Sequence, residues 1–241
     1  MSTTRDSFDR GARRYDLLVA LNPGYHAELE RAARALAQRL AAPSRARVLD
    51  IACGSGASTR ALVGALPGGT ELLGLDASPG MLEQARGKTW PDSVKFTEAT
   101  AGALDLDTLG RGAWDGILTC YLFRNVPAEL RDAAVNEAFA LLTPGGWLVV
   151  QEYSVAGRPW ARRLWSVVCW TVIIPLGVIL DRNPGLYRYL WRSVLEFDST
   201  TAFMDRLARA GFTGIAHHDA AGWQRGILHT IVAQRPAAPT R

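Results

Sequence analysis

Residues 48–59, VLDIACGSGAST, decide the fold of this chain. The mostly apolar residues 47–53 predict a short buried strand, and residues 56–66 have the composition of a helix. Gly54 and Gly56 lie between them, where glycine permits a tight turn and a close approach of a ligand to the backbone. The N–H groups at the start of the helix favour an anionic group. The stretch therefore predicts a strand, a ligand-binding loop and a helix in succession.

The loop differs from the two common nucleotide-binding fingerprints. A dinucleotide fingerprint, GxGxxG, requires a final glycine at the position that Thr59 occupies when counted from Gly54. A P-loop is excluded because no GK[ST] sequence follows. Instead, the acid Asp50 stands four residues before Gly54, and a second acid, Asp76, lies in the next predicted strand. The alternative interpretation is an ordinary strand–turn–helix connection whose glycines serve geometry alone.

Strands and helices alternate along the chain from residue 47 onward. This alternation predicts the α/β class, with a doubly wound sheet that receives ligands at the carboxyl ends of its strands. The predicted strands are residues 47–53, 71–78, 94–100, 114–123, 147–154, 214–218 and 226–234, and the predicted helices are 27–41, 56–66, 79–86, 128–142 and 199–210, with a turn at 143–146.

Composition limits the classes of function. The chain has 241 residues, enough for one large domain with a sizeable core, and 27 basic residues against 23 acidic ones. The sequence contains no run of like charges, so nucleic-acid binding is not suggested. The three cysteines have neither CxxC nor zinc spacing, so we expect no metal and a reducing cytoplasm. The polar start of the sequence does not have the pattern of a secretory signal.

The glycine loop and the two acids resemble the class I S-adenosylmethionine-dependent methyltransferases. The resemblance implies that Gly54 and Gly56 lie along the methionine part of the cofactor and that Asp76 accepts hydrogen bonds from both ribose hydroxyls. Asp50 would act near the amino group of the cofactor, directly or through water. A sulfonium ligand with a free ammonium suits nearby carboxylates. The further residues expected to bind the cofactor are Ala52, Cys53, Ala77, Met81 and Cys120.

The sequence indicates less clearly which residues would bind the adenine of the cofactor. Many members of the family have Asp or Asn after the third strand, and the matching position here is Thr100. Glu98 could substitute for it, or the backbone N–H of Ala101 could read the adenine. The class assignment does not depend on this contact.

A second set of motifs narrows the resemblance to the ubiquinone/menaquinone biosynthesis C-methyltransferase family. That family has an RN pair after strand four, then E…LPGG, then a strand ending in E-F/Y-S; here LFRNVP and AVNEAFALLTPGGWLVVQEYS match. The resemblance covers nearly the whole chain and implies a seven-stranded, Rossmann-like sheet whose last strand is antiparallel. Three further segments match: FDRGARRYD at 8–16, YRYLWRSVLEF at 187–197 and RLARAGFTGI at 206–215.

Arg124 and Asn125 are the expected catalytic pair, because the resemblance places them beside the cofactor's methyl group. Methylation of a hydroquinone carbon requires loss of a phenolic proton, which arginine cannot accept at its normal pKa. Arg124 could stabilise a phenolate or order a water, and Asn125 could fix that water. The alternative is that Arg124 pairs with Asp115 or Glu152 and supports the fold, since a buried guanidinium needs a partner.

Tyr25 and His26 are further catalytic candidates, because the N-terminal segment often caps the acceptor pocket of this fold. Tyr15, Tyr121 and Tyr153 are similar candidates, each more often a packing residue. The family usually continues after its YD motif with an Asn-containing stretch and a Trp–Arg pair; this chain keeps Asn22 but has no Trp there. The acceptor is therefore left open.

Residues 164–180, LWSVVCWTVIIPLGVIL, carry no charge and lie where the family has a variable insertion over the acceptor pocket. Their length is at the short edge of a membrane span. A span here would separate strands that share one sheet, so we reject it. Three interpretations stay open: a helical lid, a peripheral membrane contact through residues 160–180, and a homodimer contact.

We therefore predict one methyltransferase domain, residues 1–241. It comprises an N-terminal helical cap (1–45), a cofactor-binding core (46–154), a lid over the acceptor pocket (155–198) and C-terminal elements (199–234). The expected function is methyl transfer from S-adenosylmethionine to carbon or oxygen of a small hydrophobic acceptor: a quinol, an aromatic or a polyketide-like metabolite. The alternatives are a non-methylating enzyme of this fold, such as a cyclase, and a membrane-associated binding protein. The expected location is the cytoplasm, with contact to the inner face of the membrane left open.

Overall fold

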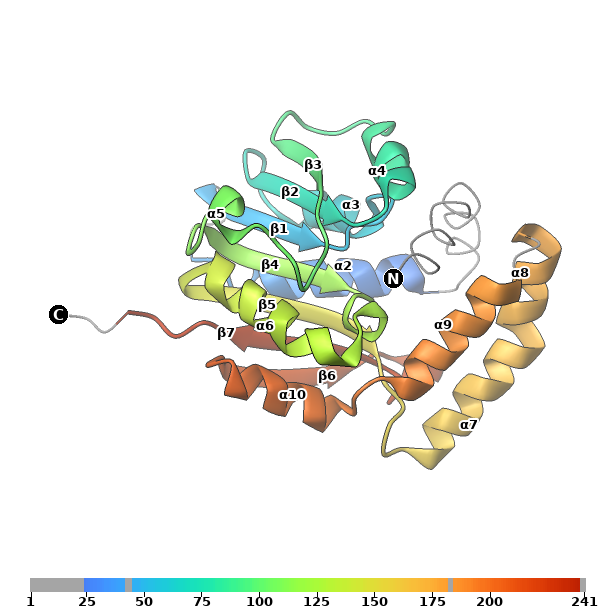
Figure 1. Ribbon diagram of the computed structural model, residues 1–241. Coiled ribbons are helices and arrows are strands. Elements are labelled where there is room, and N and C mark those ends of the chain that lie inside the picture. The colour runs from blue at the N-terminus through green and yellow to red at the C-terminus, as the bar shows by residue number, and fades with distance from the viewer. Residues whose placement is uncertain (1–23, 42–44, 182–183, 239–241) are drawn as a thin grey trace.

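The computed structural model describes residues 24–41, 45–181 and 184–238. The motif at 8–16, Tyr15 and Asn22 lie outside the described residues. Within those ranges the chain forms one twisted sheet with helices on both faces (Figure 1). This is the doubly wound α/β architecture predicted from the alternation of strands and helices.

The described strands form a seven-stranded sheet in the order β3-β2-β1-β4-β5-β7-β6. Strands β1 to β5 are parallel to one another, whereas β7 is antiparallel to both β5 and β6. The predicted antiparallel last strand is thus confirmed. The strands are β1 (Arg47–Ile51), β2 (Glu71–Asp76), β3 (Val94–Glu98), β4 (Trp114–Cys120), β5 (Leu142–Tyr153), β6 (Thr213–Asp219) and β7 (Leu228–Gln234).

Helices cover both faces of this sheet. The helix that follows β2 begins with two start signals: Ser78 caps it by accepting a hydrogen bond from Met81 N, and Pro79 occupies its first turn. The helices are α2 (Tyr25–Ala37), α3 (Ala57–Ala65), α4 (Pro79–Arg86), α5 (Leu106–Leu109), α6 (Arg131–Leu141), α7 (Pro159–Val168), α8 (Ile174–Asp181), α9 (Pro184–Glu196) and α10 (Thr200–Arg209).

Two hydrophobic clusters lie on opposite faces of the sheet, because successive side chains of a strand point to opposite faces. On one face, Val48 and Val149 pack with α2, α3 and the helices after β5. On the other face, Leu49 and Val150 pack with α6 and α10. The central strands are therefore apolar on both sides, as expected for a buried parallel sheet.

Among the strands, the ends that differ most from the sequence prediction are the end of β4 and the start of β5. Strand β4 ends at Cys120 instead of residue 123, because Tyr121 has φ 62 and leaves the extended conformation. The predicted turn at 143–146 is wrong, since β5 runs from Leu142 to Tyr153. Gly145 N and Gly146 O both bond to Arg235, so the chain after β7 holds this segment against the sheet.

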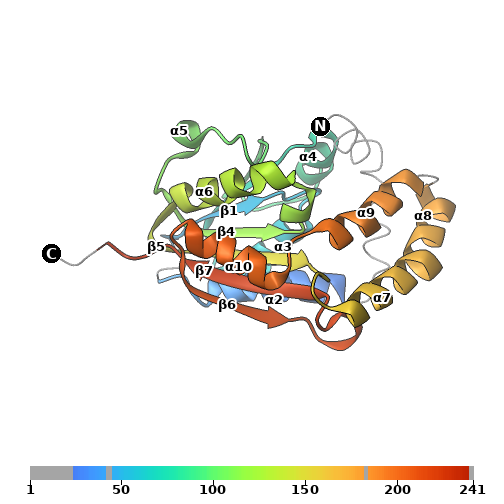
Figure 2. The ribbon, with the colours of Figure 1, turned by 60° about the horizontal axis from the view of Figure 1, so that its bottom comes forward.

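The segment predicted as a lid consists of α7, one π-helical turn (Cys169–Ile173), α8 and α9. These helices extend beyond the end of the sheet at which the parallel strands finish (Figure 1), and the turned view shows the same projection (Figure 2). They therefore lie beside the predicted ligand-binding edge. Whether they cover an acceptor pocket stays a prediction.

Candidate active site

The loop after β1 has a left-handed backbone at three positions: Ala52 (φ 64), Gly54 (φ 54) and Gly56 (φ 91). Glycine adopts this conformation without strain. A Cβ on Gly56 would lie 2.8 Å from a carbon of the Trp90 ring, so the ring closes one side of the loop. A Cβ on Gly54 would meet no atom of the described residues within 4 Å. The loop is therefore tight, and no described residue covers its backbone at Gly54.

Asp76 ties the loop to the next strand. Its Oδ2 accepts a hydrogen bond of 2.8 Å from Gly54 N, and its Oδ1 accepts one of 2.8 Å from Ser78 N. The carboxylate thus stands at the end of β2, between the glycine loop and the start of α4. A carboxylate has about four acceptor sites, so Asp76 has the capacity to hold both loops and to accept from a ligand as well.

Asp50 lies deeper, beneath the loop, and is 1% exposed. Its Oδ2 accepts hydrogen bonds from Ser58 Oγ at 2.7 Å and Thr59 Oγ1 at 2.6 Å, while its Oδ1 has no partner among the described residues. Burial raises the pKa of Asp50 to about 6, against the lowering effect of the two hydroxyls. Thr59 occupies the position at which the dinucleotide fingerprint has its final glycine. Its hydroxyl binds Asp50, an acid that the dinucleotide motif lacks.

These residues fit the S-adenosylmethionine that the resemblance implies. Asp50 Oδ1 is a buried acceptor without a described partner, which suits an ammonium or a bridging water. The space beside Gly54 would be filled by any side chain at that position. Asp76 presents a fixed carboxylate within reach of the same loop. The groups that would hold the cofactor are thus the carboxylates of Asp50 and Asp76 and the backbone at Gly54 and Gly56.

Arg124 is buried, and its guanidinium is paired. Its Nε lies 3.0 Å from Glu152 Oε1, and an NH group donates to Ser193 Oγ of α9 at 3.1 Å. Glu152 also accepts a 3.3 Å hydrogen bond from Arg124 N. Burial raises the pKa of Glu152, and the arginine opposes this rise. Of the two acids considered from the sequence, Glu152 is the partner, whereas Asp115 accepts from Arg47 N.

Asn125 connects two elements through its amide. Its Nδ2 donates to Tyr121 O at 2.7 Å, and Tyr189 OH of α9 donates to its Oδ1 at 3.1 Å. Arg124 and Asn125 therefore each bind α9, from adjacent positions of the short 3₁₀ turn Phe123–Asn125. The geometry joins the end of β4 to the projecting helices.

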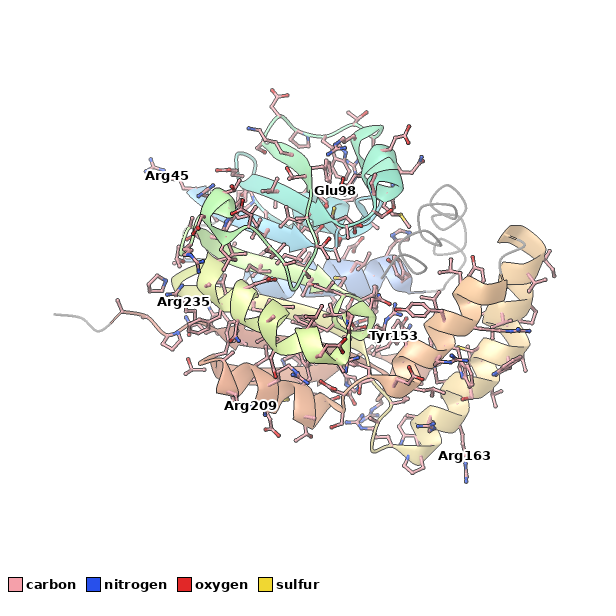
Figure 3. All side chains as sticks on the ribbon, in the orientation of Figure 1. Arg45, Glu98, Tyr153, Arg163, Arg209 and Arg235 are labelled. Carbon is pink, nitrogen blue, oxygen red and sulfur yellow. The ribbon has the colours of Figure 1, made fainter. Side chains whose placement is uncertain are left out.

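A column of aromatic rings stands beside this pair. Tyr25, Tyr121, Tyr153 and Trp165 follow one another with ring-centroid distances of 5.6, 5.2 and 5.1 Å. Tyr153 ends β5 at the edge of the sheet nearest α9 (Figure 3), and its OH accepts a 2.9 Å hydrogen bond from Gln224. The structure thus brings Tyr25, Tyr121 and Tyr153 together, all named from the sequence.

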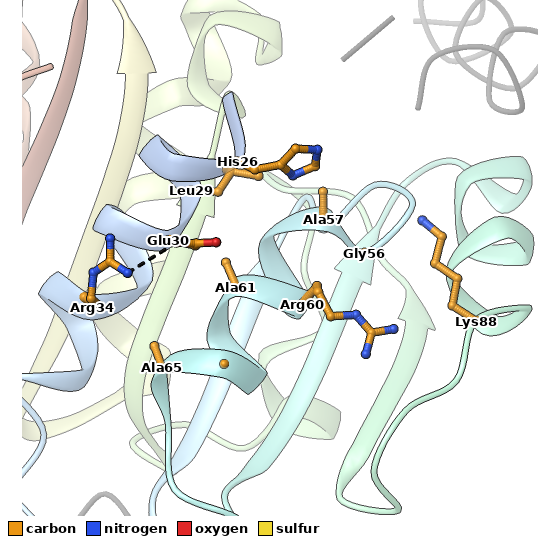
Figure 4. Close-up of a pocket in the computed structure, with 11 residues that line it drawn as sticks. His26, Leu29, Glu30, Arg34, Gly56, Ala57, Arg60, Ala61, Ala65 and Lys88 are labelled. Atoms are coloured by element: carbon orange, nitrogen blue, oxygen red, sulfur yellow. Dashed lines mark hydrogen bonds and ion pairs between the residues drawn. The ribbon is translucent and has the colours of Figure 1, made fainter. Parts of the chain in front are cut away.

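His26 lies outside this aromatic column. It lines a groove of about 500 Å³ between α2 and α3 (Figure 4), although its ring also meets the edge of Tyr25 at 5.5 Å. Lys88, across the groove, donates to Ser55 O at 2.8 Å. Tyr25 and His26 therefore point to different surroundings: Tyr25 to the aromatic column and His26 to the groove.

The remaining predicted cofactor residues occupy the same edge of the sheet. Cys53 and Cys120 are buried, and burial raises the pKa of both thiols well above the ordinary value. Met81 is buried in α4, and Ala77 lies between Asp76 and the Ser78 cap. Thr100 and Ala101 begin the loop after β3, where Gly102 N and Leu104 N donate to Glu137.

Sequence reasoning missed several residues of this site. Ser193 and Tyr189 bind Arg124 and Asn125, and both lie in the YRYLWRSVLEF motif, which was matched without assigning them a role. Glu137 carried no signal of its own, because its contacts arise only when elements distant in the sequence meet.

One described His–Asp group has ligand atoms close enough for a metal ion: His217, Asp219 and His229. His229 Nδ1 lies 2.7 Å from Asp219 Oδ1, and Arg158 lies 3.3 Å from Asp219 Oδ2. A metal ion here would meet the positive charge of Arg158. We therefore describe this group as an ion-pair cluster between β6, β7 and the start of α7.

The sequence matches characterised relatives over most of its length. Residues 3–232 match the family described as the ubiE/COQ5 methyltransferase family. A demethylmenaquinone methyltransferase of Thermus thermophilus is 35% identical over 208 residues, which are 86% of this chain and 91% of that protein. The ubiquinone/menaquinone biosynthesis C-methyltransferase UbiE of Syntrophotalea carbinolica is 32% identical over 220 residues, 91% and 90% of the two chains.

Solved structures show the same fold at low sequence identity. An S-adenosylmethionine-dependent methyltransferase of Thermotoga maritima, titled a possible histamine N-methyltransferase, has a TM-score of 0.63, 18% identity and coverage of 96% and 99% of the two chains. The [4+2]-cyclase SpnF has a TM-score of 0.67, 15% identity and coverage of 97% and 95%. These likenesses concern the fold alone.

The acid–glycine loop, the carboxylate at the end of β2 and the match of residues 3–232 agree with one another. The two relatives at 35% and 32% identity match this chain over nine-tenths of their own length. The chain belongs to the ubiE/COQ5 methyltransferase family and is an S-adenosylmethionine-dependent methyltransferase.

Proposed function

We propose that this enzyme methylates a ring carbon of a lipophilic hydroquinone. The relatives are named for ubiquinone and menaquinone biosynthesis and for demethylmenaquinone. The observation that carries the proposal within this chain is the aromatic column of Tyr25, Tyr121, Tyr153 and Trp165 beside the buried Arg124. Flat apolar walls with one cationic group suit a planar ring that bears an ionisable oxygen.

The reaction forms a carbon–carbon bond and breaks a carbon–sulfur bond. S-adenosylmethionine, when bound, supplies a methyl group activated by a sulfonium. Loss of a phenolic proton makes the ring carbon nucleophilic, and the hydrogen on that carbon leaves as a proton when the ring becomes aromatic again. This chain therefore has to hold the ring in line and stabilise a phenolate.

Arg124 is suited to phenolate stabilisation because its position is fixed. Glu152 and Ser193 hold its guanidinium, so little reorganisation is needed when charge develops nearby. Asn125 is suited to positioning: its amide joins Tyr121 O to Tyr189 OH, which argues for a role in fixing the column rather than in holding a water.

The other functions considered from the sequence are less well supported. Family membership favours methyl transfer over a non-methylating reaction, and the likeness to a cyclase concerns the fold alone. Oxygen methylation of an aromatic metabolite is the second candidate, since the aromatic column would accept a catechol as readily as a hydroquinone. The location of the methyl group on the product distinguishes the two.

The test uses the purified full-length enzyme with S-adenosylmethionine and a short-chain 2-prenyl-1,4-naphthohydroquinone kept reduced. We expect S-adenosylhomocysteine to form together with a product one methylene heavier, with the methyl on a ring carbon by NMR. The oxidised quinone should give no product, because it has no phenolic oxygen to ionise.

Asp76→Ala should abolish binding of S-adenosylhomocysteine in calorimetry, while Asp107→Ala on the exposed helix α5 should bind as the wild type does. A folded protein that binds S-adenosylhomocysteine but methylates catechol oxygen, and not the hydroquinone, would contradict the carbon-methylation proposal. A folded protein that binds neither form of the cofactor would contradict the cofactor assignment itself.

A further inference from the structure

The exposed apolar side chains of this protein gather on one segment. Eight large hydrophobic residues are exposed among the described residues, and seven of them lie between residues 160 and 179. Ile179 is 72% exposed and Val167 is 57% exposed. Monomeric proteins rarely expose so many large apolar side chains in one short segment unless that segment binds something. The seven are Trp160, Val167, Trp170, Val172, Leu176, Val178 and Ile179.

This segment has two different faces. Its inner face, with Ala161, Trp165, Cys169 and Ile174, is buried in the core, whereas the patch lies on the outer face. By length and composition, helix Pro159–Ile179 is the one described helix that could cross a membrane. A crossing would remove the inner face from the core and separate β5 from β7, its partner in the sheet. The segment is therefore suited to lie on an apolar phase, not to span one.

The charged residues of this segment indicate which kind of apolar phase it contacts. Residues 155–196 contain six arginines and two acids, a net charge of +4, which equals that of the whole chain. The remainder has 21 basic and 21 acidic residues and is neutral. Arg162 and Arg163 on α7 and Arg188 and Arg192 on α9 are exposed. The apolar patch and these four exposed arginines thus belong to the same helices, which project from one end of the sheet (Figures 1 and 2).

We propose that helices α7, α8 and α9 dock this protein onto the surface of an anionic phospholipid bilayer. Exposed arginines attract anionic headgroups, and apolar side chains enter the boundary between headgroups and acyl chains. Trp160 and Trp170, each about half exposed, are of the residue type enriched at that boundary. A second copy of this chain is a poorer occupant, because it would bring another net +4 against the first.

The docking surface is continuous with the active site. Ser193 and Tyr189 of α9 bind Arg124 and Asn125, so the docked helices also hold the predicted catalytic pair. Docking to a bilayer does not depend on which acceptor the enzyme methylates, and the test of docking uses no acceptor.

The experiment is co-sedimentation of the full-length protein with vesicles of phosphatidylcholine alone and of equimolar phosphatidylcholine and phosphatidylglycerol. We expect sedimentation with the anionic vesicles and little with the neutral ones. The double variant Val167→Glu/Ile179→Glu should lose at least about ten-fold in vesicle affinity. Trp223→Glu is the matched control, because Trp223 is an exposed hydrophobic residue outside the segment and should bind as the wild type does.

The charge contribution has its own pair of variants. Arg162→Gln/Arg163→Gln should weaken binding to anionic vesicles, whereas Arg34→Gln/Arg111→Gln, two exposed arginines elsewhere, should not. Binding of S-adenosylhomocysteine checks that each variant is folded.

The proposal is overturned if the folded wild type sediments with neither vesicle type, or if both pairs of arginine variants lose binding equally. It is also overturned if the wild type ignores vesicles but forms a dimer that Val167→Glu/Ile179→Glu dissociates.

Discussion

Arg124 and Glu152 form an ion pair, Nε to Oε1 at 3.0 Å, in which both side chains are almost fully removed from solvent. The pair joins the turn after β4 to β5, the two strands whose carboxyl ends meet at the predicted acceptor site. Removing two charges from water costs free energy that only good geometry and additional hydrogen bonds offset. Here Ser193 and two backbone N–H groups supply those hydrogen bonds.

Glu152→Ala should destabilise the protein by roughly 3–5 kcal/mol, because it leaves the Arg124 charge buried without its partner. Replacement of both residues by leucine should recover much of this loss, since no isolated charge then stays in the core. Urea unfolding followed by circular dichroism measures both. If Glu152→Ala unfolds within about 1 kcal/mol of the wild type, the ion pair does not have the role assigned here.

Ser193→Ala separates positioning from stability. It removes one charge-assisted hydrogen bond from the Arg124 guanidinium and should cost about 1.5–3 kcal/mol, less than loss of Glu152. Under the proposed mechanism it should lower kcat with little change in the affinity for S-adenosylhomocysteine, because the freed guanidinium is less well fixed. An unchanged kcat would show that α9 does not position Arg124 for the reaction.

Asp50 should make stability depend on pH in the direction opposite to a typical carboxylate. Its pKa is raised from its ordinary value of 3.8 to about 6, so the folded protein binds this proton more tightly than the unfolded chain does. The ionised carboxylate therefore opposes folding above pH 6, and this effect disappears as the pH falls towards 3.8. Asp50→Asn should stabilise the cofactor-free protein near pH 8 by up to about 3 kcal/mol, with little effect near pH 4.

The measurement is urea unfolding at several pH values between those limits. Asp105→Asn is a control in which the effect on stability has the opposite sign. Hydrogen bonds from Thr108 lower the pKa of Asp105, so its ionised carboxylate stabilises the fold. Asp105→Asn should therefore destabilise the protein at high pH and have a smaller effect on stability as the pH falls. Asp50→Asn should also reduce the stabilisation that S-adenosylmethionine provides, because the ammonium loses its counter-charge. A variant less stable than the wild type at every pH would contradict this account of Asp50.

The spatial grouping of the predicted cofactor residues could be foreseen, because these residues are local in sequence. Asp50, Gly54 and Gly56 lie within seven residues, and Asp76 follows at the end of the adjacent strand, so topology alone brings them together. The sequence left Asp115 and Glu152 as possible partners of Arg124, and only the register of β4 against β5 decides between these two acids. The aromatic column was not predictable as a unit, since it draws on α2, β5, α7 and the loop after β4.

The errors in the fold have the same cause. TPGG at 143–146 has the composition of a turn, but the residues after β7 bond to it and extend β5. Tertiary contact overrides local propensity there. Tyr121 leaves the strand conformation although its type favours strands, and no neighbour in the sequence signals its φ of 62.

Two glycines near α3 should respond in opposite ways to alanine. Gly56→Ala places a methyl group 2.8 Å from the Trp90 ring at a φ of 91, and the ring is held by its bond to Ala85 O and by Arg60 stacked at 4.0 Å. We expect a loss of at least about 1 kcal/mol and weaker binding of S-adenosylhomocysteine. Gly64→Ala, at an exposed position of α3 where a Cβ would meet no described atom within 4 Å, should gain about 0.5–1 kcal/mol and leave binding unchanged.

Thermal unfolding with and without S-adenosylhomocysteine measures both changes. Equal stability of the two variants would mean that Trp90 moves aside and does not define the loop.

The three cysteines should be inert to alkylation in the folded protein. Cys53, Cys120 and Cys169 are buried, and burial raises the pKa of all three thiols, that of Cys169 to about 12. The thiolate is the reactive form, so iodoacetamide should label none of them near pH 8 within the time in which it labels all three in urea. Mass spectrometry counts the labels. Rapid labelling of Cys53 alone would show that the glycine loop opens in solution, and protection of Cys53 by S-adenosylhomocysteine would then place the ligand over that loop.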